Sequence, residues 1–327
     1  MVNEHHTTAT CTTSVCTIPM AILARETKKV RLLCLGMPIA NRMDAVRVAE
    51  EYAMIDVISR GRLEMGFVKG APFEVSPANS NPATWMERFW EPHDLISIAV
   101  TTHDGPFNWE GEHFQYRQVN VWPRPYQDPH PPIWMTVMSP GSAAEAGSRG
   151  YSIASLNTGY LRTPEIFNGY RKAAADSGRE VTNDRFGYLA IVGVGETDEE
   201  GRRRADQILD YSRTTPRAAS QFWLPPGYTS NEVTAQMLHN RGPNMIQLRD
   251  GGEFAMQYGT VDEFINAGVA FAGDPDTVFD QIKEFYDHVG GIGHLLMMGQ
   301  GGHISHEDTV GNLTLFSKEV LPRLKDL

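Results

Sequence analysis

The sequence predicts an α/β fold in which parallel strands alternate with helices. Six apolar segments have the length and composition of buried strands, and nearly all are followed by a segment with helical periodicity. These predicted strands lie at residues 30–37, 63–68, 133–138, 151–155, 186–194 and 292–298. Such alternation is typical of a parallel sheet with helical crossovers, and a closed barrel of this kind needs eight strands.

Composition and charge narrow the possible functions. The chain has 327 residues, of which 41% are apolar and 21% charged, as in soluble globular proteins. A net charge of -11 argues against non-specific binding to nucleic acid or to an anionic membrane surface. No apolar run approaches the ~20 residues of a membrane span. The cysteines, Cys11, Cys16 and Cys34, have no zinc-binding spacing, so we expect reduced thiols in a cytoplasmic protein.

The stretch from Asp44 to Gly70 is predicted as helix, turn and strand. Helical spacing places six apolar residues on one buried face: Ala45, Val48, Ala49, Tyr52, Ile55 and Ile58. Polar residues fall largely on the other side: Arg47, Glu50, Glu51 and Asp56. Gly61 is expected to stop the helix, and the strand that follows ends at Lys69-Gly70.

The other elements follow from the same periodicities. Helices are predicted over residues 18–28, 83–102, 163–177, 197–213, 274–288 and 307–324. In the helix over 83–102, the candidate core residues are Trp85, Phe89, Leu95 and Ile96. Residues 103–131 interrupt the alternation with a predicted hairpin, and residues 214–260 are predicted to be an insertion.

Two strand ends carry residues suited to binding an anion. Lys69 precedes the flexible Gly70 at the carboxyl end of its strand, and in a barrel that end carries the chemistry. Ser139 and Ser142 lie where another strand leads into a helix that opens with Pro140. A helix N-terminus offers free N–H groups and the positive end of the dipole. The alternatives are a solvated lysine and ordinary helix capping, but two such ends together favour a phosphate-bearing cofactor.

The histidines give a weaker signal. His5 and His6 are adjacent, so in an extended chain only one of them points into a given site. His303, His306 and Asp308 follow the last predicted strand, but their loop lacks a metal-ligand spacing, so we predict no metal site. The sequence also lacks a Walker-type phosphate loop and a complete dinucleotide fingerprint.

An ordered set of short motifs resembles the bacterial luciferase-like flavin monooxygenase family. The set runs from residue 2 to the C-terminus and is least informative across 214–260. Its members are Val2–His6, Arg47–Glu51, Ser59–Glu64, Gly66–Gly70, Trp122–Pro125, His130–Trp134 and Glu319–Leu324.

The resemblance implies a TIM (β/α)8 barrel that uses reduced FMN and oxygen. In such an enzyme the cofactor performs the oxygen chemistry, while the protein binds its phosphate, seats its ring and excludes water. Lys69 and Ser139 match residues that contact the FMN phosphate, with Lys69 standing where an arginine is common. Met138 replaces an acidic residue of luciferase, and Ser142 adds a hydroxyl to the same cofactor-binding segment.

The resemblance also assigns residues near the flavin ring. Gly36 matches a small residue that packs against the ring, next to an unusual cis peptide. Val68 stands at the position of a reactive cysteine, so no such thiol is expected. His5 matches the histidine proposed as the catalytic base, a residue type that can move a proton near neutral pH.

Three functions follow from the resemblance. The first is an FMN-dependent monooxygenase that receives reduced FMN from a separate flavin reductase and oxygenates a small organic substrate. The second is a deazaflavin-dependent oxidoreductase, which transfers hydride without oxygen. The third is a non-catalytic flavin-binding or partner subunit. We expect one domain over residues 1–327, with the insertion at about 214–260, and assembly as a homo-oligomer.

The position of the first motif carries a further expectation. In the family, Glu-His-His lies just past the end of the second barrel strand, whereas here it begins at Glu4. The resemblance therefore implies an N-terminally incomplete barrel that lacks the first strand, its helix and most of the second strand. Six predicted strands and two absent ones make the eight of a barrel. Such a chain would expose sheet edges and apolar faces, and would be less stable, prone to association, and weakly active or inactive.

Overall fold

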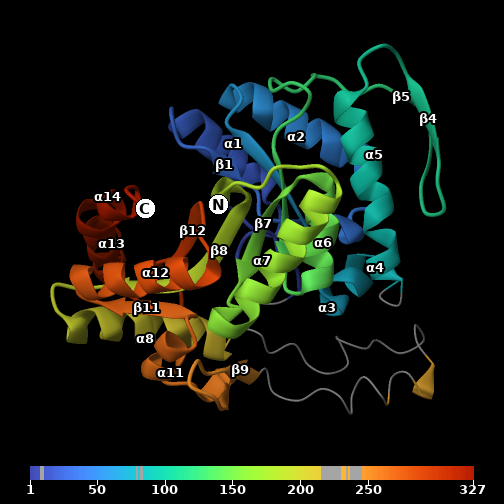
Figure 1. The fold of residues 1–327 in the computed structure, drawn as a ribbon. Coiled ribbons are helices and arrows are strands. Elements are labelled where there is room, and N and C mark those ends of the chain that lie inside the picture. The colour runs from blue at the N-terminus through green and yellow to red at the C-terminus, as the bar shows by residue number, and fades with distance from the viewer. Residues whose placement is uncertain (8–10, 79, 82–83, 215–229, 233–234, 236–244) are drawn as a thin grey trace. The chain divides into compact units, whose positions relative to one another are not determined.

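The computed structural model describes residues 1–7, 11–78, 80–81, 84–214, 230–232, 235 and 245–327 (Figure 1). The chain divides into two compact units. The first comprises residues 1–136 with 217–240, and the second comprises 137–216 with 241–327. Each unit contains parallel strands and helices.

The first unit is built around the strand β3 (Leu63–Val68). Three other strands pair with it in parallel: β1 (Leu32–Leu33), β2 (Met37–Pro38) and β6 (Ile133–Val137). The first five residues of β3 are all buried, although the apolar residues alternate with Glu64 and Gly66. Both faces of a parallel strand are usually covered, and here Glu64 is enclosed by hydrogen bonds from Trp134 and Arg31.

The helices of the first unit largely confirm the predicted ones. They are α1 (Thr17–Glu26), α2 (Ala45–Ser59), α3 (Pro72–Val75), α4 (Trp85–Arg88) and α5 (Trp90–Thr101). The predicted hairpin is also present, formed by β4 (Phe107–Glu110) and β5 (Gln115–Val119) (Figure 1). Glu91 of α5 fixes its turn by accepting hydrogen bonds from the Trp109 ring and the backbone N–H groups of His113 and Phe114.

The predicted strand over residues 30–37 is two short strands, β1 and β2. Between them the backbone passes very close to β3, because a Cβ at Gly66 would lie 1.7 Å from the carbonyl oxygen of Cys34. Gly36 is equally constrained, since a Cβ there would lie 2.6 Å from Val68 Cγ1. The Leu35–Gly36 peptide is cis, as the resemblance implied.

The prediction for the buried face of α2 is wrong at Asp56 and at Ile58. Asp56 is fully buried, and Ile58 is 38% exposed. Asp56 accepts two hydrogen bonds from Gln127, each of 2.8 Å, which compensate for its burial. The predicted helix end is nearly right: Arg60 and Gly61 both take the left-handed conformation, with φ of 59° and 78°.

The second unit is built around β8 (Phe186–Val194). Three strands pair with it in parallel: β7 (Ser152–Leu156), β11 (Ala270–Gly273) and β12 (His294–Met298). The larger helices are α6 (Pro140–Arg149), α7 (Gly159–Asp176), α8 (Asp198–Thr214), α12 (Pro275–Val289) and α13 (His306–Leu315). Figure 1 shows β11 between α8 and α12, and both helices contact it.

Several predictions for the second unit need correction. β11 and the short helix α11 (Val261–Asn266) were missed, because four apolar residues between turns carry little periodicity. α7 begins before Pro164, which lies inside it. The predicted closing helix is α13, the π-helical segment η5 (Phe316–Val320) and α14 (Leu321–Leu324). Much of the predicted insertion lies outside the described residues; its described part includes β9 (Met245–Gln247) and β10 (Glu253–Ala255), which pair as a hairpin.

The predicted class, parallel strands with helical crossovers, is confirmed in both units. The closed eight-stranded barrel and its missing start are not, and the strand count that supported them overlooked β11. The single-domain prediction stays a prediction. None of the helices in the described part of the chain is long and apolar enough to cross a membrane.

Candidate active site

Lys69 is the first residue after β3, at the carboxyl end of the first unit's central strand. Its side chain is half-buried rather than free in solvent. The Nζ atom lies 5.7 Å from the centre of the Phe89 ring and 6.0 Å from that of Trp90. Aromatic faces attract a cation, and they also restrict its hydration. The two aromatic rings therefore restrict the position of the Lys69 side chain. The alternative prediction from the sequence was a lysine surrounded by solvent in a loop.

The chain turns back immediately after Lys69 and brings a carboxylate to this strand end. Gly70 has a φ of +76°, a conformation that favours glycine. Four residues later, Glu74 on α3 is only 2% exposed. Its Oε2 accepts a hydrogen bond of 3.1 Å from the N–H of Ala71. Glu74 was not predicted, because its histidine partners lie 68 and 69 positions earlier in the chain.

His5 and His6 are held by two different carboxylates. His5 Nδ1 lies 2.9 Å from Glu74 Oε1, and the N–H of His6 donates to that same oxygen at 3.0 Å. The His6 ring turns away, with Nε2 3.1 Å from Glu4 Oε1. The expectation that the two rings face different ways is confirmed, and His5 is the one joined to the loop after β3.

Glu4 is a buried hub of the N-terminal segment. Besides His6, its carboxylate accepts hydrogen bonds of 2.9 Å from the N–H of Cys16 and 3.0 Å from Arg42 Nη2. Burial raises the pKa of Glu4, but the hydrogen bond from His6 and the charge of Arg42 outweigh burial, so the pKa lies below its usual 4.5. Glu4 therefore ties residues 4–6 to α1 and to the turn before α2.

Asn41 is a buried polar residue at this strand end. It closes the 3-10 turn η1 (Ile39–Asn41) that follows β2, and it is 7% exposed. Neither its amide nitrogen nor its amide oxygen has a hydrogen-bond partner among the described residues. Its Oδ1 would lie 3.8 Å from a Cβ built at Gly70, so it borders the turn that carries Lys69. A buried amide usually has partners, and a polar ligand would supply them.

Gly36 lies in the segment between β1 and β2 and is buried against β3. Its lack of a side chain is required by Val68 and Gly66 of that strand. The packing of Gly36 against a flavin ring therefore stays a prediction, because the neighbouring strand already explains a glycine at this position.

In the second unit, Ser139 caps α6 as predicted. Its Oγ accepts a hydrogen bond of 3.3 Å from the N–H of Ser142, and Pro140 takes the first helical position. The two hydroxyls lie 3.0 Å apart, and Ser142 Oγ donates to the carbonyl of Ser139 at 3.0 Å. All these groups are at the surface. Ser139 therefore acts as a helix cap in the structure, and its contact with a phosphate stays a prediction.

Met138 precedes this cap and lines a pocket of about 450 Å³. The same pocket contains Asn157, which follows β7, and Arg162 of α7. Arg162 donates a hydrogen bond of 3.0 Å to the carbonyl of Met138. Arg162 was not identified from the sequence. Its positive charge lies near the N-terminus of α6 and would attract the same anion that Ser139 and Ser142 are predicted to bind.

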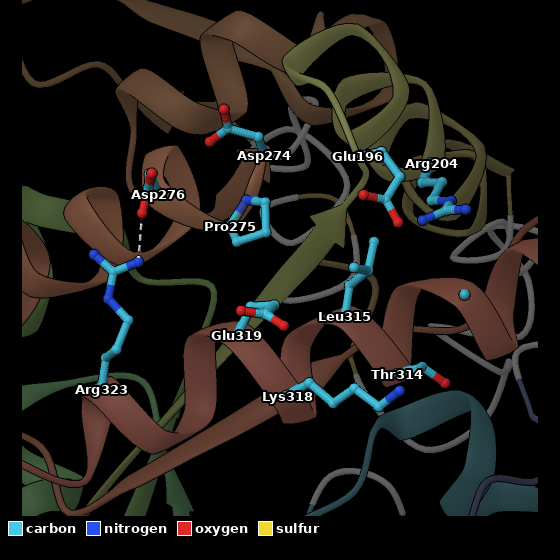
Figure 2. Close-up of a pocket in the computed structure, with 11 residues that line it drawn as sticks. Glu196, Arg204, Asp274, Pro275, Asp276, Thr314, Leu315, Lys318, Glu319 and Arg323 are labelled. Carbon is cyan, nitrogen blue, oxygen red and sulfur yellow. Dashed lines mark hydrogen bonds and ion pairs between the residues drawn. The ribbon is translucent and has the colours of Figure 1, made fainter.

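Figure 2 shows another pocket of the second unit, of about 770 Å³, with charges of both signs in its lining. Arg323 forms an ion pair of 2.7 Å with Asp276. Arg204 forms one of 2.7 Å with Glu200 and also contacts Asp308. Since the charges compensate one another and none of the predicted site residues lines this pocket, it does not favour a phosphate.

The structure thus brings together part of the predicted site. In the first unit, His5 bonds to Glu74, Glu74 and Asn41 both lie close to the Gly70 turn, and Lys69 directly precedes that turn. In the second unit, Met138, Ser139 and Ser142 form one segment at the start of α6. Glu74 and Asn41 were missed, since no local pattern marks them. In the described ranges, no group of three or more His, Cys, Asp or Glu side chains could hold a metal ion.

Comparison with known proteins gives a family and several relatives. The family model described as luciferase-like monooxygenase matches residues 1–291. The oxygenase component of a flavin-dependent trigonelline monooxygenase from Acinetobacter baylyi is 27% identical over 77% of this chain and 74% of its own length. An F420-dependent glucose-6-phosphate dehydrogenase from Amycolatopsis mediterranei is 24% identical over 94% of this chain and 83% of its own length.

Another relative is matched over a smaller share of its length. The uncharacterized protein y4wF from Sinorhizobium fredii is 29% identical over 63% of this chain, and the match spans 56% of that protein. Among solved structures, the oxygenating constituent of 3,6-diketocamphane monooxygenase from Pseudomonas putida, in complex with FMN, has a TM-score of 0.75. It is 20% identical, with 98% of this chain and 87% of that chain covered, and shows a similar fold.

Proposed function

Because the chain belongs to the luciferase-like monooxygenase family, we propose that it is a flavin-dependent monooxygenase that uses reduced FMN and oxygen to oxygenate a small organic substrate. The observation that carries the proposal is the β3 end of the first unit. There a half-buried cation, a buried amide with no hydrogen-bond partner among the described residues, and a histidine joined to a buried carboxylate lie around the turn at Gly70.

This strand end fits a phosphate-bearing flavin. Lys69 would bind the phosphate, and the rings of Phe89 and Trp90 beside it restrict the water that otherwise weakens an ammonium–phosphate contact. Asn41 would offer an N–H donor and a carbonyl acceptor to the polar edge of a bound ligand, which satisfies an amide that otherwise has no partner among the described residues.

In this proposal, His5 is the residue that transfers the proton. Bound reduced flavin supplies the reaction with oxygen, and the chain binds, orients and moves protons. The contact between His5 Nδ1 and Glu74 fixes one side of the ring and leaves Nε2 to take up or release a proton. The contribution of Ser139, Ser142 and Met138 to phosphate binding concerns the second unit and stays a prediction.

A separate flavin reductase is the proposed partner. The trigonelline monooxygenase relative is named as an oxygenase component, a name typical of a system in which another protein reduces the flavin. A second candidate function is favoured by the relative named as an F420-dependent dehydrogenase, whose match covers 94% of this chain. In that case the chain would bind a reduced deazaflavin and transfer hydride without oxygen.

The two functions are separated by titrating the purified protein with reduced FMN and with reduced deazaflavin, first without oxygen. We expect saturable binding of reduced FMN with a lower Kd than for the deazaflavin. Admission of air to the FMN complex should then consume oxygen and oxidise the flavin, and with a suitable substrate one oxygen atom should appear in the product and the other in water. Tighter binding of the reduced deazaflavin, with oxygen-independent hydride transfer from it to the substrate, would establish the second candidate instead. Reduced FMN that binds without product formation from any substrate tested would favour a non-catalytic flavin-binding subunit.

A further inference from the structure

Two neighbouring histidines each meet a buried carboxylate, but through different nitrogens. His5 presents Nδ1 to Glu74, and His6 presents Nε2 to Glu4. Both carboxylates are almost completely buried, at 2% and 1% exposure. The identity of the bonded nitrogen decides which nitrogen of each ring is left for chemistry, because a neutral imidazole has one donor and one acceptor.

The surroundings of Glu74 indicate the direction of the His5 hydrogen bond. Glu74 accepts from two backbone N–H groups, those of His6 at 3.0 Å and Ala71 at 3.1 Å. Both are obligate donors, and two such donors stabilise the ionised form of a buried carboxylate. An ionised carboxylate only accepts hydrogen bonds, so its third partner, His5 Nδ1, must carry the hydrogen. His5 Nε2 then holds the lone pair.

We propose that Glu74 is the positioning residue of His5, an inference that rests on the proposed function. Glu74 holds the His5 ring in the Nδ1–H tautomer, so that Nε2 exchanges the proton. In the forward direction the Nε2 lone pair accepts a proton from the reacting group, and the ring becomes a cation. Its Nδ1–H bond stays intact, and the Glu74 charge stabilises the cation. Loss of the proton from Nε2 restores the neutral ring.

The same loop carries Lys69 and Glu74, which connects cofactor binding with proton transfer. A Cβ added at Gly70 would lie 3.8 Å from Asn41 Oδ1 and 3.9 Å from Glu74 Oε2. The left-handed turn at Gly70 thus directs the chain back toward His5 directly after the residue proposed to bind phosphate. Glu4 has no such connection, because its other partners, Cys16 and Arg42, tie His6 to α1 and the turn before α2.

The chain offers a closely matched control for substitutions at Glu74. Glu91 also accepts hydrogen bonds from two backbone N–H groups, those of His113 and Phe114, and from one ring N–H, that of Trp109. It holds the β4–β5 turn, and none of its hydrogen bonds within the described part of the chain involves a proposed site residue. Glu91→Gln therefore removes the same charge from the same kind of hydrogen-bond pattern in the same unit.

The first measurement uses the full chain labelled with ¹⁵N-histidine, without flavin. Two-bond ¹⁵N–¹H spectra, with His5→Gln to assign the signals, report which ring nitrogen carries the hydrogen. We expect Nδ1–H in the wild type and in Glu91→Gln. In Glu74→Gln the carboxamide can donate to Nδ1, so we expect a shift to Nε2–H. The inference would be overturned if the His5 ring carries its hydrogen on Nε2 in the wild type, or if its tautomer is the same in Glu74→Gln as in the wild type.

The second measurement is turnover. Loss of an orienting partner costs roughly ten- to hundredfold in activity, so Glu74→Gln should lower kcat by that factor with the Kd for reduced FMN within about twofold of wild type. Glu74→Asp, which restores the charge, should recover part of kcat, and Glu91→Gln should keep it. Equal losses in Glu74→Gln and Glu74→Asp would assign Glu74 a merely structural role.

The two proposals fail in different ways. If reduced FMN does not bind the wild type, the proposed function is wrong. The tautomer experiment still tests the interaction between Glu74 and His5, because it is done without flavin. If FMN binds and turnover depends on His5 but not on Glu74, the positioning role is wrong and the function survives. Should Glu74→Gln not fold, as judged by its thermal midpoint, Glu74→Asp provides the same spectra and kinetics, with a shorter side chain that should weaken the Nδ1–H preference.

Discussion

The two strand ends predicted to bind an anion are built in different ways. At the end of β3, in the first unit, the groups around the Lys69 turn come from distant parts of the chain: His5 and Glu74 are 69 positions apart. At the end of β6, the second unit begins with Ser139 and Ser142, whose hydroxyls bond to one another and to backbone three residues away. One end is a buried network of charges, and the other is an exposed helix cap.

The difference shows how strongly each end indicates function. Capping hydroxyls satisfy the free N–H groups that every helix has, so a cap needs no ligand. Burying a carboxylate, or an amide that has no partner among the described residues, costs free energy, so such groups indicate a function more strongly than a helix cap does. We therefore expect substitutions at the β3 end to change catalysis and cofactor binding, and substitutions at the β6 end to change mainly helix stability.

The largest expected effect is on turnover and distinguishes the two histidines of the β3 end. His5→Ala should lower kcat by roughly a hundredfold or more, the usual size of a lost proton-transfer group, with flavin affinity nearly unchanged. His6→Ala is the matched control, because its ring bonds to Glu4 rather than Glu74. A large loss of kcat in His6→Ala, with little in His5→Ala, would reverse the assignment of the two residues.

Cofactor affinity tests whether the β3 end binds the phosphate. A charge-assisted contact contributes about 1.5–3 kcal/mol, so Lys69→Ala should weaken FMN binding by about ten- to a hundredfold. Lys69→Arg keeps the cation and should stay within a few-fold of the wild type. Flavin titration followed by fluorescence or absorbance measures both variants. An unchanged Kd in Lys69→Ala would remove the β3 end from the phosphate site.

Local features of the fold were predictable from the sequence, and distant partners were not. The Ser139 cap with Pro140 after it, and the strand over residues 186–194, depend on neighbouring residues alone and agree with the structure. Asp56 was placed on the wrong face of α2, because the residue that satisfies it, Gln127, lies 71 positions later. Periodicity assigns burial by residue type and cannot identify a polar group whose partner comes from another element.

The candidate site shows the same limit. Lys69 and Ser139 could be proposed because a strand end and a helix start are visible in the sequence. Glu74 and Asn41 were missed, since a single carboxylate or amide in a loop has no signal of its own. The family resemblance supplied His5, and the structure added the carboxylate that holds its ring. β11 was missed because four residues are too few for a periodic pattern.

Glu4 provides a stability test of the buried network around the β3 end. Glu4→Gln removes the charge that Arg42 and the N–H of Cys16 bind. Loss of one partner from a buried charged group costs about 2–4 kcal/mol, so denaturant unfolding at pH 7 should show a loss of this size. Glu51→Gln is the control, because Glu51 is 25% exposed and lies 4.0 Å from the same Arg42; it should cost less than about 1 kcal/mol.

The pH dependence of the Glu4 variant has a definite sign. The folded-state pKa of Glu4 lies below its ordinary 4.5, with burial opposed and outweighed by the hydrogen bond from His6 and the charge of Arg42. The ionised form therefore stabilises the fold fully above pH 4.5, and this stabilisation is lost as the pH falls toward the folded-state pKa. The stability difference between wild type and Glu4→Gln should shrink in that range. If this stability difference instead grows as the pH falls, the ionised form of Glu4 does not stabilise the fold.

The smallest expected effects concern Ser139, and one substitution separates the cap from the anion site. Ser139→Ala should destabilise by about 1 kcal/mol through loss of the bond to the N–H of Ser142. Ser139→Asp keeps a good cap and adds a charge that the helix dipole favours, so stability should stay within about 0.5 kcal/mol of wild type. If phosphate binds at this helix start, the carboxylate repels it, and FMN affinity should fall by about tenfold. Unchanged affinity in Ser139→Asp would leave the β6 end as a helix cap only, with Lys69 as the tested phosphate contact.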